Sequence, residues 1–93
     1  MELQGRVAVI TGGTRGIGRA IAEGFFADGA SVVINGRSAE KGAQAVKEMN
    51  GGDRVHFVQG DIKSREGCQA IIDAAIAKYG KIDIMVNNAG GAT

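Results

Sequence analysis

The sequence predicts an α/β protein in which four parallel strands alternate with three helices in the order β-α-β-α-β-α-β. Short apolar, β-branched runs occur at four places in the chain, and longer segments between them have apolar residues at helical spacing. A helical connection of that length joins parallel strands through a right-handed crossover. These observations indicate the first half of a doubly wound sheet.

The strands are the most regular feature of the sequence. Val7–Thr11 is an apolar run without polar alternation, which is typical of a strand buried on both faces of a parallel sheet. Similar runs predict strands at Ser31–Asn35, Val55–Gln59 and Ile82–Asn87. In a doubly wound sheet of the dinucleotide-binding type, we expect these four strands in the spatial order 3-2-1-4.

The first helical segment follows the first strand and ends at Asp28-Gly29, where Gly29 can take a left-handed conformation. Its small and apolar residues repeat at helical spacing, so one face is expected to point inward. That face consists of Ile17, Ala20, Ile21, Gly24 and Phe25.

Two further helices have plausible N-cap residues, Ser38 and Ser64. The second helix is expected to stop at Asn50-Gly51-Gly52, and the third near Gly80. Cys68 is interpreted as a small buried hydrophobe. The inward faces are predicted to consist of Ala43, Val46 and Met49 in the second helix, and of Cys68, Ile71, Ile72, Ala75, Ile76 and Tyr79 in the third.

Composition excludes several classes of protein. The chain has 93 residues and a net charge of +1 with no basic cluster, so we expect no nucleic acid as a partner. No apolar run comes near the ~18 residues of a membrane span, so we expect no membrane either. A single cysteine and a single histidine make a dedicated metal site unfavourable and favour the cytoplasm. No linker divides the sequence, so residues 1–93 are expected to form one unit without a second domain.

The densest motif is the glycine turn, residues 11–18 (TGGTRGIG), between the first strand and the first helix. Glycines there permit a tight turn and a close approach of a phosphate to the helix N-terminus. A P-loop would need Lys-Ser/Thr where Arg19-Ala20 stand, and the G-x-G-x-x-G fingerprint would need a glycine at Ile21. The alternative is that the glycines serve only close packing of helix on strand.

The glycine turn resembles the coenzyme signature of short-chain dehydrogenases/reductases, in particular the 3-oxoacyl-carrier-protein-reductase-like branch. Asn87-Asn88-Ala89-Gly90 resembles the family's NNAG motif, and Asp61-Ile62 its contact with adenine. The resemblance spans nearly the whole chain and implies a Rossmann-type sheet that binds a dinucleotide. The implied coenzyme-binding residues are Gly12, Gly13, Thr14, Arg15, Gly16, Ile17, Gly18, Asn35, Arg37, Asp61, Ile62, Asn88, Ala89 and Gly90.

The end of the second strand bears on the choice between NAD and NADP. An NAD site places an acid about 20 residues after the glycine turn, but residues 35–38 read Asn-Gly-Arg-Ser and no acid occurs before Glu40. Arg37, helped by Arg15, can bind a 2′-phosphate instead. We therefore expect NADP(H) to be preferred over NAD(H), unless both arginines are ordinary surface cations.

The resemblance also implies roles for residues after the third and fourth strands. Asp61 and the Ile62 amide would contact adenine, whereas Asn88, Ala89 and Gly90 would line the coenzyme's ribose. Asp61 could alternatively form only an Asx-turn or lead into the next helix. The residues after the fourth strand could alternatively form only a polar turn.

The resemblance implies that the chain takes part in hydride transfer between NADP(H) and a small carbonyl or alcohol substrate. The family's Ser, Tyr and Lys are not in place: the one tyrosine is Tyr79, and Asp83 stands where the lysine would. No catalytic residue is assigned, the 93-residue chain alone is expected to be inactive, and a homo-oligomer is expected only at full family length. A non-catalytic nucleotide-binding module and a methyltransferase-like fold remain as alternatives.

Overall fold

A computed structural model describes residues 2–88 of the chain. Seven regular elements alternate along it, with one short 3-10 turn, η1, before the third strand. In chain order they are β1 (Val7–Thr11), α1 (Gly16–Ala27), β2 (Ser31–Gly36), α2 (Ala39–Met49), η1 (Gly52–Arg54), β3 (Val55–Gln59), α3 (Arg65–Tyr79) and β4 (Ile84–Asn87).

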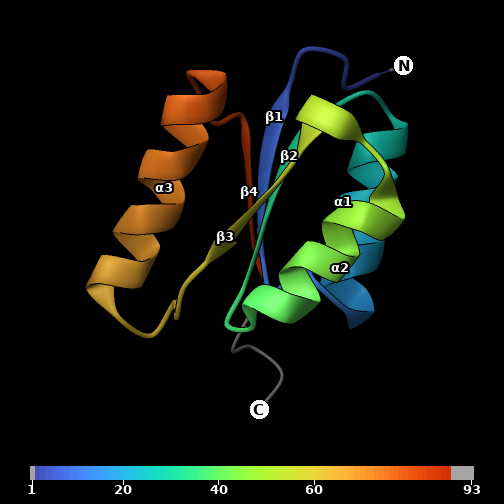
Figure 1. Ribbon diagram of the computed structural model, residues 1–93. Helices are drawn as coiled ribbons and strands as arrows, with labels where there is room; N and C mark the ends of the chain where they lie inside the picture. The colour runs from blue at the N-terminus through green and yellow to red at the C-terminus, as the bar shows by residue number, and fades with distance from the viewer. Residues whose placement is uncertain (1, 89–93) are drawn as a thin grey trace.

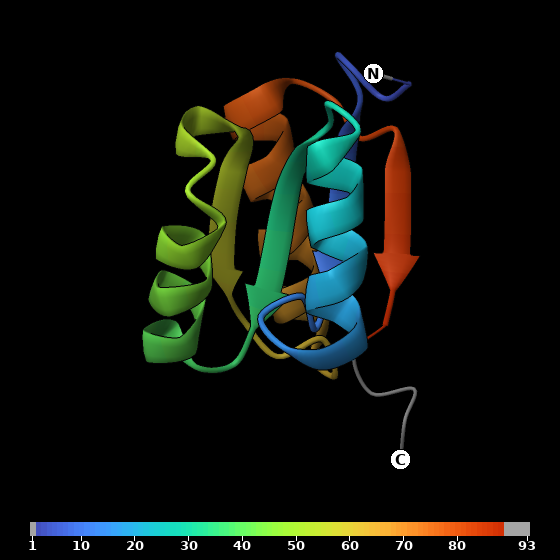
Figure 2. The same ribbon diagram turned by 90° about the vertical axis from the view of Figure 1, so that its right-hand side faces the viewer.

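The four strands form one parallel sheet in the order β3-β2-β1-β4, as the sequence predicts. Figure 2 faces the sheet, with β4 at one edge and β3 at the other. Val9 of β1 pairs with Val33 of β2 on one side and with Met85 of β4 on the other. All four strands therefore end at the same edge of the sheet, and their carboxyl ends lie together.

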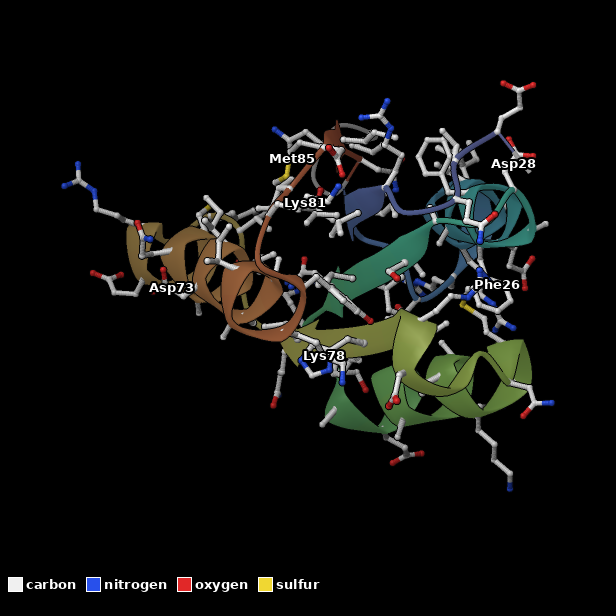
Figure 3. The ribbon with its side chains drawn as sticks, turned by 90° about the horizontal axis from the view of Figure 1, so that it is seen from above. Phe26, Asp28, Asp73, Lys78, Lys81 and Met85 are labelled. Carbon is white, nitrogen blue, oxygen red and sulfur yellow. The ribbon has the colours of Figure 1, made fainter. Side chains whose placement is uncertain are left out.

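The helices cover the sheet on both faces. Figure 1 shows α1 and α2 on one side and α3 on the other. Viewed from above, Phe26 of α1 and Asp73 of α3 lie on opposite sides of the sheet (Figure 3). Side chains such as Ile10 and Ile34 face α1 and α2, whereas Val9 and Val33 pack with Ile71 of α3. This division accounts for strands that are apolar on both faces.

The strand boundaries differ slightly from the predicted ones. β2 extends by one residue to Gly36, whereas β4 begins at Ile84 rather than at Ile82. Asp83 explains the later start, because its carboxylate Oδ2 accepts the hydrogen bond of the Val7 amide at 2.8 Å. In a longer β4, a backbone carbonyl oxygen would accept the hydrogen bond of the Val7 amide. Here the Asp83 carboxylate accepts it instead.

The predicted helix ends are confirmed. Ser38 Oγ accepts a hydrogen bond from the Lys41 amide, and Ser64 Oγ accepts one from the Gly67 amide. Gly29 follows α1 with φ +102°, and Gly80 follows α3 with φ +82°, so both use the left-handed region that favours glycine.

Among the described residues, no helix is long and apolar enough to cross a membrane.

The predicted inward face of α3 is wrong in part. Ile71 and Ala75 are buried, but Cys68, Ile72 and Ile76 are exposed. The three exposed residues follow one another at intervals of four, so they form one flank of the helix. The helix rests on the sheet through Ile71 and Ala75, and no described element covers that flank.

The predicted inward faces of α1 and α2 also need correction. Ile17 is 74% exposed because the first turn of α1 stands at the carboxyl edge of the sheet; Ala20, Gly24 and Ala43 are exposed as well. In α2, Gly42 is buried instead, against the ring of Phe57, where any Cβ would overlap the ring. Because the inward face was predicted from apolar side chains, a glycine that packs on a ring could not be identified in this way.

Candidate coenzyme-binding site

A pocket of about 300 Å³ lies at the carboxyl ends of β1, β2 and β3. These are the strand ends at the lower edge of the sheet in Figure 2. In open α/β sheets, ligands bind outside this edge. The pocket is lined by Gly12, Thr14, Arg15, Asn35, Gly36, Arg37, Gly60, Asp61, Ile62 and Lys63.

The glycine turn is held against the end of β2. Gly12 adopts φ +67°, in the left-handed region that favours glycine, and the Gly13 amide donates to the Asn35 carbonyl oxygen at 2.9 Å. A Cβ on Gly13 would stand 2.9 Å from Ile34 Cγ2, so this position has no room for a side chain. The two consecutive glycines therefore serve different purposes. Gly12 allows a left-handed backbone conformation, and Gly13 allows the turn to pack closely against Ile34.

The other side of the turn is fastened to the end of β4. The Asn88 amide donates to Thr11 Oγ1 at 2.9 Å, and Asn88 Nδ2 donates to the Gly12 carbonyl oxygen at 3.5 Å. A Cβ on Gly18 would overlap that same carbonyl oxygen. The predicted role of Asn88 is a contact with the ribose, and Thr11 is not among the predicted binding residues. A hydroxyl at the end of a central strand is the signal that could have identified Thr11.

The N-terminus of α1 differs from those of the other two helices. Its N-cap residue is Arg15, whose side chain makes no capping hydrogen bond, and its first turn has no acidic residue. In contrast, α2 and α3 are capped by Ser38 and Ser64. The positive end of the α1 dipole is therefore available to an anion beside the glycine turn.

Asn35 connects the floor of the pocket to β3. It is 1% exposed, and its Nδ2 donates to the carbonyl oxygens of Val58 and Gly60, both at 3.1 Å. The Gly60 amide in turn donates to the Gly36 carbonyl oxygen at 3.1 Å. Asn35 therefore lines the pocket and also positions the loop that follows β3.

Positive charge predominates around the pocket. Arg15, Arg37 and Lys63 are exposed lining residues, and none of their side chains has an ion-pair partner within residues 2–88. Asp61 is the one carboxylate among the lining residues. Cationic side chains that are not already paired favour an anionic ligand.

Asp61 forms the Asx-turn that sequence reasoning held as an alternative. Its Oδ1 accepts a hydrogen bond from the Lys63 amide at 2.9 Å, and its carbonyl oxygen accepts one from the Ser64 amide. The turn carries the chain from β3 into α3. It also holds the carboxylate at the rim, where Oδ2 has no hydrogen-bond partner within the described residues.

The residues predicted from the sequence fall into three groups. Those that line the pocket are Gly12, Thr14, Arg15, Asn35, Arg37, Asp61 and Ile62. Those that shape the turn and the start of α1 without lining the pocket are Gly13, Gly16, Ile17, Gly18 and Asn88. Ala89 and Gly90 lie outside the described residues. Sequence reasoning missed Gly36, Gly60 and Lys63, although each is adjacent to a predicted residue.

The tyrosine and the histidine do not line the pocket. The Tyr79 hydroxyl donates to the Asp53 carbonyl oxygen at 2.6 Å, before the start of β3 and thus at the opposite edge of the sheet. Burial, with the Asp53 charge, raises the pKa of Tyr79, and burial, with the Lys78 charge, lowers the pKa of His56. Within residues 2–88, no cluster of three or more His, Cys, Asp or Glu side chains is placed to hold a metal ion.

The chain is similar in sequence and in structure to known dehydrogenases. The chain is 46% identical over 89 residues to an NADP-dependent (R)-specific alcohol dehydrogenase of Lentilactobacillus kefiri, covering 96% of the chain and 35% of that relative. It is 42% identical over 92 residues to glucose 1-dehydrogenase 2 of Bacillus subtilis, again covering 96% of the chain and 35% of the relative. The apo crystal structure of a Caenorhabditis elegans glucose dehydrogenase superposes with a TM-score of 0.90 at 38% identity, covering 99% of this chain and 40% of that one.

The chain spans about a third of the length of these two relatives. The family model for short chain dehydrogenases matches residues 6–93, which include the glycine turn, the end of β2 and the loop after β3. This match removes the methyltransferase-like alternative that the glycine turn by itself left open. The chain belongs to the short chain dehydrogenase family.

Proposed function

We propose that residues 1–93 form the NADP-binding part of a short-chain oxidoreductase. One observation carries the choice of coenzyme: Arg15 and Arg37 line the same pocket, and no carboxylate stands at the end of β2. An acid at that strand end would bind the 2′-hydroxyl of NAD, whereas a guanidinium suits the 2′-phosphate of NADP.

The pocket residues suit the parts of the coenzyme in turn. Arg37 and Arg15 would hold the 2′-phosphate, and the amide groups at the start of α1 would face the pyrophosphate. Asp61 and the Ile62 amide would meet the adenine, and Asn88 would support the glycine turn beside the ribose. The bound coenzyme supplies the hydride, and these residues bind and orient it.

The activity of the whole protein is part of the same proposal. A short-chain oxidoreductase of this kind exchanges hydride between NADP(H) and a small carbonyl or alcohol substrate, in the cytoplasm and as a homo-oligomer. Tyr79 is not placed to act as a general acid at this pocket, because it lies at the far edge of the sheet and burial raises its pKa. The proton donor and the substrate site are therefore assigned to a part of the protein other than residues 2–88.

The proposal is tested by titrating the 93-residue chain with NADPH and with NADH and following binding calorimetrically. A charge-assisted hydrogen bond contributes about 1.5–3 kcal/mol, so NADPH should bind roughly tenfold more tightly or better. Arg37→Asp should remove or reverse that preference. Lys47→Asp, an exposed charge change on α2 away from the pocket, is the matched control and should leave it intact.

Equal affinity of the unaltered chain for both coenzymes at low salt would show that the assignment of Arg37 is wrong. Equal effects of Arg37→Asp and Lys47→Asp would mean that net charge, rather than a contact at the end of β2, sets the preference.

A further inference from the structure

Gly36, the last residue of β2, is a glycine for reasons of space rather than of conformation. Its φ is not among the positive values that the chain's other turn glycines adopt. A Cβ at this position would stand 2.9 Å from Thr14 Cγ2 and 3.1 Å from Thr14 Oγ1. The Thr14 side chain of the glycine turn therefore occupies the volume into which a β2 side chain would project.

The branched side chain of Thr14 makes this contact hard to relieve. Both of its heavy-atom branches are close to the Gly36 position, so two of the three staggered positions around χ1 point that way. A rotation that moves one branch away brings the other into its place, because a β-branched residue fills two of the three positions at once. On the far side, Phe57 Cε1 stands 3.7 Å from the same point and limits a sideways shift.

The location of the contact gives it a bearing on coenzyme choice. Gly36 and Thr14 both line the pocket, and Gly36 lies about 20 residues after the glycine turn, where an NAD site places its acid. We infer that Thr14 is a specificity-determining residue: by packing on Gly36 it excludes an acid from the end of β2. In this inference Arg37 and Arg15 attract the 2′-phosphate, and Thr14 keeps the competing carboxylate away from the end of β2.

The steric part of this inference is tested without any coenzyme, by thermal unfolding of the 93-residue chain. Gly36→Ala should lower the Tm in the unaltered background and in Thr14→Val, whose side chain has the same branched shape. The same change should have little effect in Thr14→Ser or Thr14→Ala, because an unbranched or absent γ group can leave the space free. An equal loss of Tm from Gly36→Ala in all four backgrounds, or no loss in any, would overturn the inference.

The specificity part rests on the proposed NADP function and is tested by titration with NADH and NADPH. Gly36→Asp alone should gain little affinity for NADH, whereas Thr14→Ser with Gly36→Asp should gain roughly tenfold or more, the effect of about one charge-assisted bond. The double variant Thr14→Ser with Gly36→Asn is the neutral control and should lose less affinity for NADPH than its Asp counterpart. A full gain of NADH affinity from Gly36→Asp alone would overturn the role of Thr14.

The unfolding experiment and the titration can fail independently, so they distinguish a failure of this inference from a failure of the proposed function on which it rests. If the unaltered chain bound neither coenzyme, the proposed function would fail, while the unfolding measurements would still decide whether Thr14 and Gly36 are coupled. If NADPH bound as proposed and the unfolding cycle showed no coupling, the inference would fail and the proposed function would stand.

Discussion

The side-chain amide of Asn35 donates a hydrogen bond to the Gly60 carbonyl oxygen at 3.1 Å, joining the ends of β2 and β3 beneath the pocket. The same nitrogen also donates to the Val58 carbonyl oxygen. Asn35 is buried, although it also lines the pocket. One side chain thus couples the stability of the sheet to the shape of the candidate site.

Asn35→Ala should destabilise the chain and loosen the loop after β3. Removing the amide takes one hydrogen bond from each of two part-buried carbonyl groups, which together costs about 1–3 kcal/mol. Denaturant unfolding measures the loss of stability, and titration with NADPH measures the loss of affinity. Gln44→Ala, which removes an exposed side-chain amide on α2, is the control and should change neither quantity much. Full stability of Asn35→Ala would contradict the assigned role.

Asp83 should make the stability of the chain depend on acid pH. The hydrogen bond from the Val7 amide, followed by Lys81, lowers the pKa of Asp83 below its ordinary value of 3.8. A lowered folded-state pKa adds stability above the unfolded-state pKa, and that stability is lost as the pH falls through the folded-state pKa. Asp83→Asn should therefore lower the Tm at neutral pH, and the difference from the unaltered chain should shrink toward low pH.

The measurement is a series of thermal unfolding curves from neutral to strongly acid pH. Asp73→Asn on α3 is the control, since Asp73 lies on an exposed helix face and bonds to Gln69 of its own helix. A Tm difference for Asp83→Asn that stays constant across the whole pH range would show that the contact is not ionic in character.

The 93-residue chain should not reduce carbonyl compounds with NADPH. Tyr79 is committed to the Asp53 carbonyl oxygen, and burial raises its pKa, which is the opposite of what a proton donor at neutral pH requires. The assay follows oxidation of NADPH with a panel of ketones and 3-oxoacyl thioesters. Tyr79→Phe should lower stability by about 0.5–1.5 kcal/mol through the lost hydrogen bond and leave NADPH affinity unchanged. Turnover that Tyr79→Phe abolished would place the chemistry at Tyr79 after all.

The outer edge of β4 should promote self-association of the chain. Within residues 2–88, β4 has a strand neighbour on one side alone, and Met85 on it is 49% exposed. Open strand edges pair readily with other chains, and a charge on the edge discourages it. Sedimentation at increasing concentration should show oligomers that Met85→Lys reduces and that Ile72→Lys on α3 does not; a monomer throughout would refute the expectation.

The sequence was a good guide to the fold because its signals are local. The apolar run at Val7–Thr11 and the caps at Ser38 and Ser64 each depend on neighbours a few residues away, and all are confirmed. The exposed flank at Cys68 could not be predicted, because the apolar residues of α3 cover more of its circumference than the sheet does. Which part of an apolar helix is covered depends on where the helix rests, and that is a property of the whole fold.

The candidate site was predictable to the extent that motifs mark it. Seven of the residues chosen from the sequence line the pocket, and Lys63 and Gly36 were missed although they adjoin chosen ones. The hydrogen bond from the Asn88 amide to Thr11 Oγ1 joins positions 77 apart in the chain, so no local sequence pattern indicates it. The contact between Thr14 and Gly36 is hidden for another reason: a glycine that is needed for space looks in a sequence like any other glycine.

The strand order has a consequence for the way the chain acquires its shape. β3, β2 and β1 pair through helical connections of moderate length, whereas β4 must find β1 across more than seventy residues. Bringing such distant segments together costs more chain entropy and slows the step. We therefore expect the pocket walls to form before the bonds from Asn88 to Thr11 and Gly12. A chain in which β4 has not yet paired would have the residues that line the pocket in place, but not the bonds that hold the glycine turn to the end of β4.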